Sequence, residues 1–368
     1  MIILETTRPT VMEVDLNAFE HNINKIREYV GESVELMPVI KANAYGTYIN
    51  KVNEVISEFN IVAVATVDEA VELREQGYKN EIFVLNQPYK DEMKKIAKYN
   101  ITIGISSDSF LETLGNSSEK FNIHIEIGTG MGRTGINPNR VEEYIEKVKE
   151  YKNIEIEGIY THLSSADIDK EYTEKQLMYF ERAVKKAKQI LGEIKYIHCN
   201  ASNGILNFTE NSYNLVRPGM IMYGYEPFEG AKKKIDLKPV CKLKSKITFL
   251  KEVEEGTSIG YSRSYITRRK TKVATIPIGY ADGFKRELSN KGYVLISGKK
   301  APIIGSICMD GFMADVTDID VSVGDDVYIW DNENITLEEV AKLAGTMNYE
   351  MMSTIMHRVP RIFIKREN

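Results

Sequence analysis

Lys41 stands where a lysine side chain can act as a nucleophile. It ends the apolar run ELMPVIK and is followed by the loop ANAYG. A lysine at the end of an apolar strand is poorly solvated, which lowers its pKa and favours the neutral amine. A neutral amine can condense with an aldehyde to form a Schiff base. The alternative is a lysine whose ammonium group simply extends along apolar surface to reach water.

Three other polar residues stand in or at the end of apolar runs. Glu126 lies between Ile125 and Ile127, where a charge without a partner is costly. Arg217 ends the run LVR and is followed by Pro-Gly, which is more specific than an ordinary surface ion pair. His162 follows the run IEGIYT, although a single histidine in a strand is usually a satisfied core residue.

Alternating short strands and longer helices are expected to position these residues. The runs end near residue 235, and helical patterns cover 67–75, 141–148 and 172–190 between them. Eight such strands predict a (β/α)8 barrel, with a doubly wound parallel sheet as the alternative. Active sites of barrels form at the carboxyl ends of the strands, where Lys41 would lie. The eight expected strands are 36–41, 61–65, 82–85, 101–105, 123–127, 154–162, 196–199 and 215–217.

The pattern changes after about residue 235. From 240 to 330 apolar and polar residues alternate between closely spaced turns, as in CKLKSKITFL and DVYIW, and a short helix over 336–344 follows. This pattern predicts a mostly-β domain. We therefore expect an α/β chain with a barrel over 1–235 and a β domain over 236–368.

Composition excludes several classes of function. The net charge of −5 gives no electrostatic footprint for nucleic acid. The N-terminal segment MIILETTRPTVMEVDL lacks the features of a signal peptide, and no apolar run is long enough to span a membrane. Cys199, Cys241 and Cys308 lie far apart, which argues against a metal site and favours buried free thiols in a cytoplasmic protein.

The string around Lys41, PVIKANAYG, resembles the cofactor-lysine motif of the alanine racemases. These are barrel-type enzymes that depend on pyridoxal 5'-phosphate. Further blocks resemble that family in the family's order and span nearly the whole chain: IEIGTGMGRTGI, YTHLSSAD, HCNASNGIL, LVRPGMIMYG, IGYSRSY, IPIGYADGFKRELS, GSICMD and MNYE with HRVPRIF. One difference follows the lysine motif, because many relatives read AYGHG where this chain reads AYGTY, with Thr47.

The resemblance assigns a residue to each chemical group of the cofactor. Lys41 would hold the aldehyde. Arg217 would face the pyridine nitrogen and leave it unprotonated, because a guanidinium donates hydrogen bonds at every relevant pH. His162 would lie against the ring. The residues that match the phosphate site are Tyr45, Ser202, Gly219, Met220 and Tyr349.

The resemblance also assigns the substrate side of the site. Arg133 would orient the cofactor's phenolic oxygen and the substrate carboxylate. Many relatives carry a carbamylated lysine seven residues before this arginine, whereas this chain has Glu126, and Gly128 stands where an aspartate is usual. A glutamate already offers Arg133 a carboxylate without modification.

A second group of residues comes from the β domain. Tyr261 matches the base that serves the substrate face opposite Lys41, because racemisation removes a proton from one face and returns one to the other. Met309 matches a residue that contacts the substrate, and Tyr280 resembles a tyrosine near the entrance of the site. In the family this domain closes the barrel of the partner subunit, so a homodimer with shared sites is implied.

The resemblance therefore predicts an alanine racemase that binds pyridoxal phosphate and a small amino acid, but neither nucleic acid nor membrane. A racemase for another small amino acid such as serine is the first alternative, although bulky Tyr349 favours alanine. A non-catalytic pyridoxal-phosphate carrier would lack the blocks of Tyr261 and Met309. A decarboxylase would need a protonated pyridine nitrogen, which Arg217 disfavours.

Overall fold

The first half of the chain folds into a barrel of parallel strands. The computed structural model describes residues 6–365, so the first five residues of the expected leaderless N-terminus lie outside it. Six strands form one parallel sheet in chain order: β3(Ile61–Val64), β4(Glu81–Val84), β5(Thr102–Ile105), β6(Phe121–Glu126), β7(Ile154–Tyr160) and β8(Tyr196–His198).

Two short strands close this sheet into a ring. β2(Glu35–Leu36) and β9(Leu215–Val216) pair with each other in parallel. A bridge from Val39 to Ala63 joins the end of β2 to β3, and a bridge from Ala201 to Arg217 joins the end of β8 to β9. The expected (β/α)8 barrel is therefore confirmed, and the doubly wound alternative is wrong.

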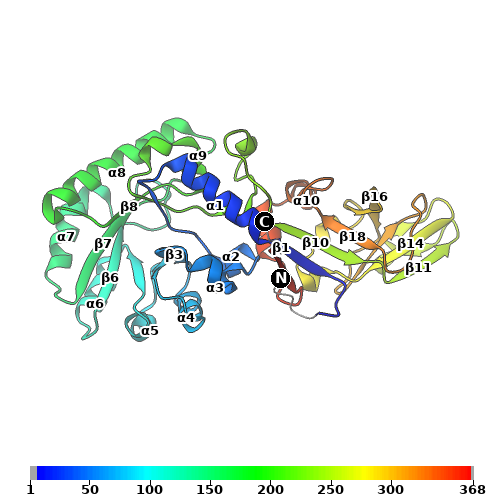
Figure 1. The fold of residues 1–368 in the computed structure, drawn as a ribbon, viewed down its shortest axis with the longest axis horizontal. Helices are drawn as coiled ribbons and strands as arrows, with labels where there is room; N and C mark the ends of the chain where they lie inside the picture. Colours follow the sequence, from blue (N-terminus) through cyan, green and yellow to red (C-terminus); the bar gives the residue numbers. More distant parts are fainter. Residues whose placement is uncertain (1–5, 366–368) are drawn as a thin grey trace.

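Helices connect the strands and cover the outside of the barrel (Figure 1). α4 begins at a capping box in which Thr66 accepts from the N–H of Glu69, as the sequence predicts. α1 precedes β2 and buries Phe19, Ile23 and Ile26 on one face. The helices of this half are α1(Leu16–Val30), α2(Lys41–Tyr45), α3(Asn53–Ile56), α4(Val67–Glu75), α5(Met93–Lys98), α6(Asp108–Gly115), α7(Val141–Lys149), α8(Lys170–Leu191) and α9(Ser202–Asn207).

The second half is mostly β, as expected. Its main sheet has nine strands in the order β11-β14-β17-β16-β15-β18-β10-β1-β19. The strands after the barrel are β10(Cys241–Lys246), β11(Phe249–Val253), β12(Ser258–Ile259), β13(Tyr265–Ile266), β14(Thr271–Ile276), β15(Tyr293–Ile296), β16(Lys299–Ile304), β17(Phe312–Asp315), β18(Asp326–Trp330) and β19(Arg361–Ile364), with α10(Leu337–Ala344) and α11(Asn348–Ser353) between the last two.

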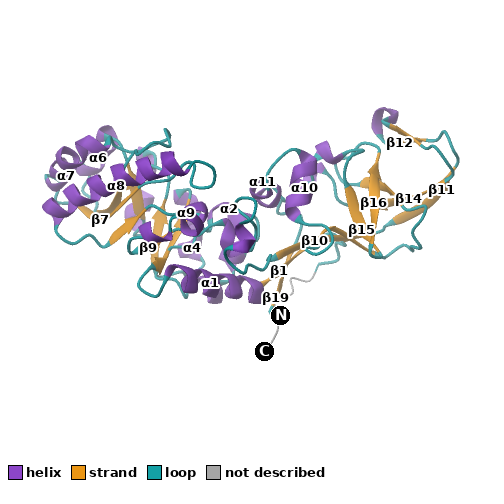
Figure 2. Ribbon diagram, turned by 90° about the horizontal axis from the view of Figure 1, so that it is seen from above, coloured by secondary structure: helices purple, strands orange, loops and turns teal. Residues whose placement is uncertain are grey.

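The sequence pattern did not reveal that the chain starts in this sheet. β1(Val11–Asp15) pairs antiparallel with β10 and parallel with β19. The chain thus passes from the β sheet into the barrel and back again, and the two halves lie end to end in an elongated molecule (Figures 1 and 2).

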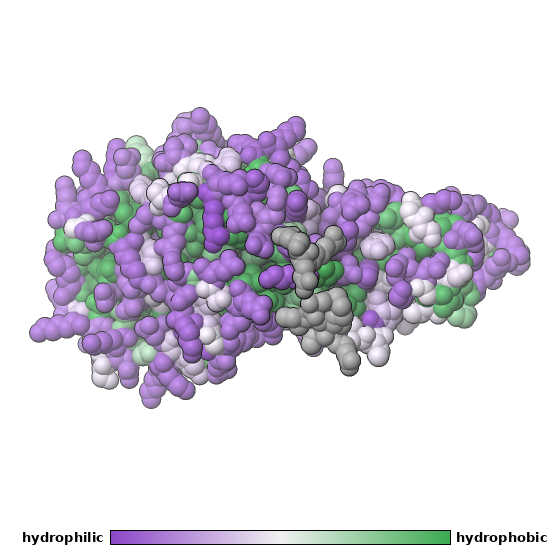
Figure 3. Space-filling model, in the orientation of Figure 1, coloured by the Kyte–Doolittle hydropathy of each residue, from purple (hydrophilic) through white to green (hydrophobic). Residues whose placement is uncertain are grey.

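Polar side chains cover most of the face drawn in Figure 3, and hydrophobic residues show only in small areas. Most of the apolar side chains pack in one buried cluster that extends through both halves. No helix of residues 6–365 is long and apolar enough to cross a membrane. Cys199 and Cys241 are buried free thiols as expected, but Cys308 is only half-buried.

Candidate active site

One cavity lies at the carboxyl ends of the barrel strands. Its volume is about 520 Å³, and it takes its lining from the loops after β2, β4, β6, β7, β8 and β9 and from α11. A site at this end of a barrel is built from loops that rigid strands hold in place. The lining includes eight of the residues expected from the sequence: Lys41, Tyr45, Arg133, His162, Ser202, Arg217, Gly219 and Tyr349.

Lys41 is the first residue of α2 and opens into this cavity. Burial lowers the pKa of its amine, and the positive charges of Arg133 and Arg217 lower it further. Glu69 opposes them and raises the pKa. The net shift is downward, so the amine is neutral at a lower pH than that of an exposed lysine.

The backbone that follows Lys41 is strained. Ala42, Asn43, Ala44 and Tyr45 all have positive φ, between 52° and 56°, and form a left-handed turn without a glycine among them. Such a conformation costs about 1–2 kcal/mol per L-residue, so tertiary contacts must hold it.

Contacts hold both ends of this left-handed turn. At its start the N–H of Ala42 donates to Oε1 of Glu69 at 2.6 Å, while Oε2 of the same carboxylate accepts from the N–H of Ala65 at 2.8 Å. At its end Gly46 has φ 82°, and a Cβ there would lie 2.4 Å from the carbonyl oxygen of Met352 in α11. The carbonyl of Gly46 also accepts from Nε of Arg361 at 2.9 Å.

Thr47 is accommodated by local hydrogen bonds. Its side chain is buried, and its hydroxyl donates to the carbonyl of Ala44 at 2.7 Å and accepts from the N–H of Ile49 at 3.2 Å. The residue that departs from the family's AYGHG pattern therefore supports the turn after Lys41 and does not open into the cavity.

Hydroxyl and N–H groups gather around Gly219. Its N–H donates to Oγ of Ser202 at 3.1 Å, and a Cβ at this position would lie 2.8 Å from the hydroxyl oxygen of Tyr45. The Tyr45 and Tyr349 rings are 6.1 Å apart, so α11 supplies the second tyrosine. The side chain of Met220 is fully buried behind this group, where only its backbone could face a ligand. This cradle of donors fits a phosphate, and a side chain at position 219 would fill it.

Arg217 is a buried cation without an acidic partner among the described residues. Its Nη1 donates to Nδ1 of His198 at 2.6 Å. Its Nη2 donates to the carbonyls of Thr161 and Cys199 at 2.8 and 3.0 Å and to Nδ1 of His162 at 3.2 Å. These four bonds use only the two terminal nitrogens, so none engages Nε–H. That group fits an acceptor such as an unprotonated ring nitrogen.

His162 lies in the cavity wall as a neutral imidazole. Burial, together with the charges of Arg217, Arg133 and Lys41, lowers its pKa to about 3. Because Arg217 can only donate, Nδ1 of His162 accepts and the proton lies on Nε2. A neutral ring of this kind can pack flat against an aromatic ligand.

Glu126 and Arg133 do not form the direct pair expected from the sequence. Oε1 of Glu126 accepts from Thr134 at 2.8 Å and Oε2 accepts from the Tyr160 hydroxyl at 3.2 Å, and no hydrogen bond joins it to Arg133 within residues 6–365. Burial raises the pKa of Glu126, while Thr134, Arg133 and Tyr160 lower it. Arg133 itself is exposed at the cavity, free to meet a carboxylate.

Tyr261, Tyr280 and Met309 stand apart from the cavity of their own chain. All three lie in the β half, with exposed fractions of 70%, 44% and 53%. Tyr261 follows β12, which Figure 2 shows at the end of the molecule remote from the barrel and α2. A single chain therefore does not bring Tyr261 to Lys41.

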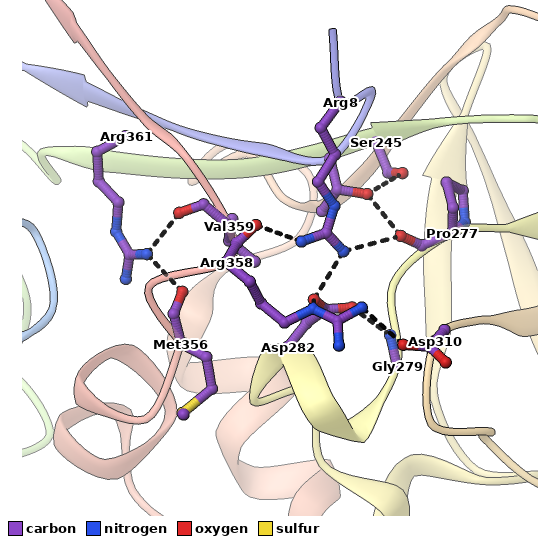
Figure 4. Close-up of polar contacts among 11 residues, drawn as sticks. Arg8, Ser245, Pro277, Gly279, Asp282, Asp310, Met356, Arg358, Val359 and Arg361 are labelled. Atoms are coloured by element: carbon purple, nitrogen blue, oxygen red, sulfur yellow. Dashed lines mark hydrogen bonds and ion pairs between the residues drawn. The ribbon is translucent and has the colours of Figure 1, made fainter. Parts of the chain in front are cut away.

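An ionic cluster around the buried Asp282 fixes the loops of Tyr280 and Met309 (Figure 4). Asp282 is fully buried and contacts Arg8 at 2.6 Å and Arg358 at 2.8 Å. Its other oxygen accepts from the N–H of Gly279 at 2.9 Å, while Arg358 also contacts Asp310 at 2.6 Å. The residues just before Asp282 and Asp310 are thus held on one rigid framework.

Four polar residues of the cavity were not singled out from the sequence. Asn86 follows β4, Asn203 lies in α9, and Glu350 and Ser353 lie in α11. Oδ1 of Asn203 is buried without a hydrogen-bond partner among the described residues. Its place in the block HCNASNGIL, next to Ser202, was the available signal.

Comparisons with known proteins agree across the whole chain. The family models described as "Alanine racemase, N-terminal domain" and "Alanine racemase, C-terminal domain" match residues 14–227 and 240–363. An alanine racemase of Halothermothrix orenii is 40% identical over 366 residues, which cover 96% of this chain and 97% of that protein. One of Methanococcus maripaludis is 39% identical over 371 residues, covering 97% and 99%.

Solved structures give the same result. An alanine racemase of Clostridium difficile 630 matches with a TM-score of 0.92 at 35% identity, covering 98% of this chain and 97% of that one. The enzyme of Bacillus anthracis with bound L-Ala-P matches with a TM-score of 0.92 at 32% identity, covering 98% and 96%. The resemblance seen in the sequence is thus confirmed, and the chain belongs to the alanine racemase family of isomerases.

Proposed function

We propose that this chain is a pyridoxal-phosphate-dependent alanine racemase that interconverts L-alanine and D-alanine. The observation that carries the proposal is the set of residues that line the barrel cavity. It brings together the lowered-pKa amine of Lys41, the donor cradle at Gly219 and the buried guanidinium of Arg217. Family membership and the names of the relatives support the reaction and the substrate.

The residues of the cavity fit pyridoxal 5'-phosphate. Lys41 would hold its aldehyde carbon, and His162 would lie against its ring. The hydroxyls of Tyr45, Ser202 and Tyr349 and the backbone N–H groups of Gly219 and Met220 would hold the phosphate. When bound, the cofactor withdraws electrons from the substrate's α-carbon and makes the α-proton acidic.

Arg217 would donate from Nε to the ring nitrogen. A guanidinium cannot deliver its proton at any relevant pH, so the ring nitrogen stays unprotonated. This limits how far electrons move into the ring and favours returning a proton to the α-carbon over transamination. The same limit disfavours a decarboxylase.

Two bases would act on opposite faces of the α-carbon. The amine of Lys41 serves one face, and the phenol oxygen of Tyr261 of the partner subunit serves the other. One base takes the α-proton and the other returns a proton from the opposite side, which inverts the configuration. In this arrangement a homodimer carries two identical sites, each completed by the partner's β domain.

The remaining residues would bind the substrate. Arg133 would orient the substrate carboxylate, and Met309 of the partner subunit would contact the substrate. Glu126 supplies a negative charge near Arg133 without carbamylation, while Tyr280 would line the entrance. Tyr349 and Tyr45 crowd the cavity wall and favour the methyl group of alanine over a larger side chain. Cofactor binding would fall to the barrel within 1–235 together with Tyr349 of α11, and closure of the partner's site would fall to the other part of 236–368 that carries Tyr261 and Met309.

We infer a cytoplasmic setting from the thiols. Cys199, Cys241 and Cys308 are all free, as is usual in a reducing compartment.

An absorption spectrum and a racemisation assay test the proposal together. The purified protein should show the near-visible absorbance of a lysine-bound cofactor, and borohydride should fix the adduct on Lys41. L-alanine should lose optical rotation faster than L-serine. Lys41→Ala should lose both signals, whereas Lys185→Ala, on the exposed surface of α8, should keep them.

Each other outcome has a definite meaning. An adduct on another lysine contradicts the role of Lys41. Faster turnover of L-serine identifies a serine racemase. A bound cofactor without racemisation of either amino acid identifies a carrier.

A further inference from the structure

A chain of buried nitrogen atoms leads from Arg217 into the barrel core. Nη1 of Arg217 donates to Nδ1 of His198 at 2.6 Å, and Nε2 of His198 lies 2.9 Å from Nδ1 of His124. Both imidazoles are fully buried. His124 lies in β6, does not line the cavity and has no part in the proposed reaction.

The direction of every hydrogen bond in this chain is forced. A guanidinium can only donate, so Nδ1 of His198 must accept and its proton must lie on Nε2. That Nε2–H then donates to Nδ1 of His124, which places the proton of His124 on Nε2 as well. The pKa values of both imidazoles are lowered, mainly by burial, so both rings are neutral as this pattern requires.

The fold makes specific room for His124. A Cβ at Gly158 on the neighbouring strand would lie 2.7 Å from its ring, and the pairing of β6 with β7 shifts register between Ile123 and His124. Phe83 stacks on the ring at 4.4 Å. Yet Nε2 of His124 is buried without a partner among the described residues, which is unfavourable for an N–H group. An apolar residue would avoid this cost, so stability alone does not account for the histidine.

We propose that His124 is a positioning residue that holds the His198 ring with Nδ1 toward Arg217, and so fixes the guanidinium where it meets the cofactor's ring nitrogen. Without the acceptor at His124, the Nε2–H of His198 would be buried and unpaired. Rotation of the His198 ring would relieve this and remove the acceptor from Arg217. The inference rests on the proposed function for the role of Arg217, but the hydrogen-bond chain itself does not.

Two variants of similar size distinguish the role of His124 as a hydrogen-bond acceptor from its role in packing. His124→Asn keeps an oxygen acceptor close to the position of Nδ1, whereas His124→Leu removes it. With Leu we expect kcat to fall about tenfold, with KM within about twofold, because a buried donor loses its partner. The absorbance maximum of the bound cofactor should also shift. With Asn, kcat and the absorbance maximum should both stay near the wild type. The Leu and Asn variants should have similar melting temperatures, so a difference in kcat between them would not come from a difference in stability.

The tautomers of His198 and His124 can be measured by NMR on the wild-type protein without cofactor. The chain has five histidines, so their ¹⁵N resonances can be assigned by single substitutions. His198 and His124 should each show a pyridine-like Nδ1 and a pyrrole-like Nε2. A proton on Nδ1 of His124, or equal kinetics and spectra in the Leu and Asn variants, would overturn the proposal. A wild-type protein that binds no cofactor would instead refute the proposed function and leave the resonance test intact.

Discussion

Single residues of the site owe their properties to neighbours that the sequence places far away. The strand-end position of Lys41 predicts a neutral amine, and burial with two arginines lowers its pKa accordingly. The sequence could not show that the negative charge of Glu69 raises the pKa of Lys41. The sequence identifies Glu69 as the end of a capping box, but its second contact, to Ala42, spans 27 residues and depends on the pairing of neighbouring barrel strands.

Glu69→Gln should lower the pKa of Lys41 further. Glu69 raises that pKa by stabilising the ammonium form, so removing its negative charge favours the neutral amine at lower pH. The pH midpoint for capture of pyridoxal phosphate by the cofactor-free protein should therefore shift downward. Asp68→Asn makes the same change of charge on the exposed side of α4 and should leave the midpoint in place. An upward shift of this pH midpoint in Glu69→Gln would contradict the predicted effect of Glu69 on the pKa of Lys41.

Glu126 illustrates what residue spacing can and cannot predict. Its position between two isoleucines indicates a buried carboxylate that needs partners, and the structure supplies Thr134 and Tyr160. The direct pairing with Arg133 is not formed, because the segment after β6 carries Arg133 to the exposed side of the cavity. The influence of Glu126 on Arg133 is one of charge at a distance.

Glu126→Gln should weaken substrate binding while activity stays independent of dissolved carbon dioxide. The change removes the charge near Arg133 and replaces one acceptor by a donor opposite Thr134 or Tyr160. Because Glu126 acts on Arg133 by charge at a distance and not through a hydrogen bond, its loss should cost binding about 1 kcal/mol, so KM should rise about fivefold. Steady-state kinetics in carbon-dioxide-free and bicarbonate buffers check both parts. Wild-type KM in the variant would mean that Glu126 has no such role.

At the scale of elements, the barrel could be predicted because its strands are short, continuous apolar runs. Seven of the eight expected strands appear with bounds that differ by no more than two residues, and the carboxyl ends of the strands gather the site. The first, expected over 36–41, ends at Leu36 in β2, and Lys41 instead begins α2. The left-handed turn of α2 could not be predicted, since Ala42, Ala44 and Tyr45 disfavour positive φ and only tertiary contacts hold them there. The place of β1 beside β19 was also hidden, because it joins segments from opposite ends of the chain.

Gly46→Ala should disturb the site through this left-handed turn. Both the positive φ and the 2.4 Å approach to the carbonyl of Met352 oppose a side chain, so the loss of unfolding free energy should be about 3 kcal/mol or more. Cofactor affinity should fall as well, because α2 carries Lys41 and α11 carries Tyr349. Gly345→Ala is the matched control, with φ 73° and open space around the added methyl, and should cost only about 1–2 kcal/mol. Equal melting temperatures for the two variants would contradict the packing role of Gly46.

At the scale of the whole molecule, the two halves contribute to the site in different ways. The C-terminal segment returns to the barrel, where α11 places Tyr349 in the cavity of its own chain and Arg361 supports Gly46. Tyr261 is exposed and follows β12, which lies at the end of the molecule remote from the barrel (Figure 2). Family motifs identify both tyrosines, but only the three-dimensional structure separates them. That separation is the reason to propose that two chains share each site.

Mixing two inactive variants tests this central claim most directly. Lys41→Ala lacks one base in both sites of its homodimer, and Tyr261→Phe lacks the other. In a mixed dimer, one site combines Lys41 from the second variant with Tyr261 from the first and is intact, while the other site lacks both bases. Random exchange makes about half of the dimers mixed, so about a quarter of wild-type racemase activity should return after dissociation and reassociation. Activity that stays at the level of the separate variants, with subunit exchange confirmed by mass spectrometry, would contradict the shared site.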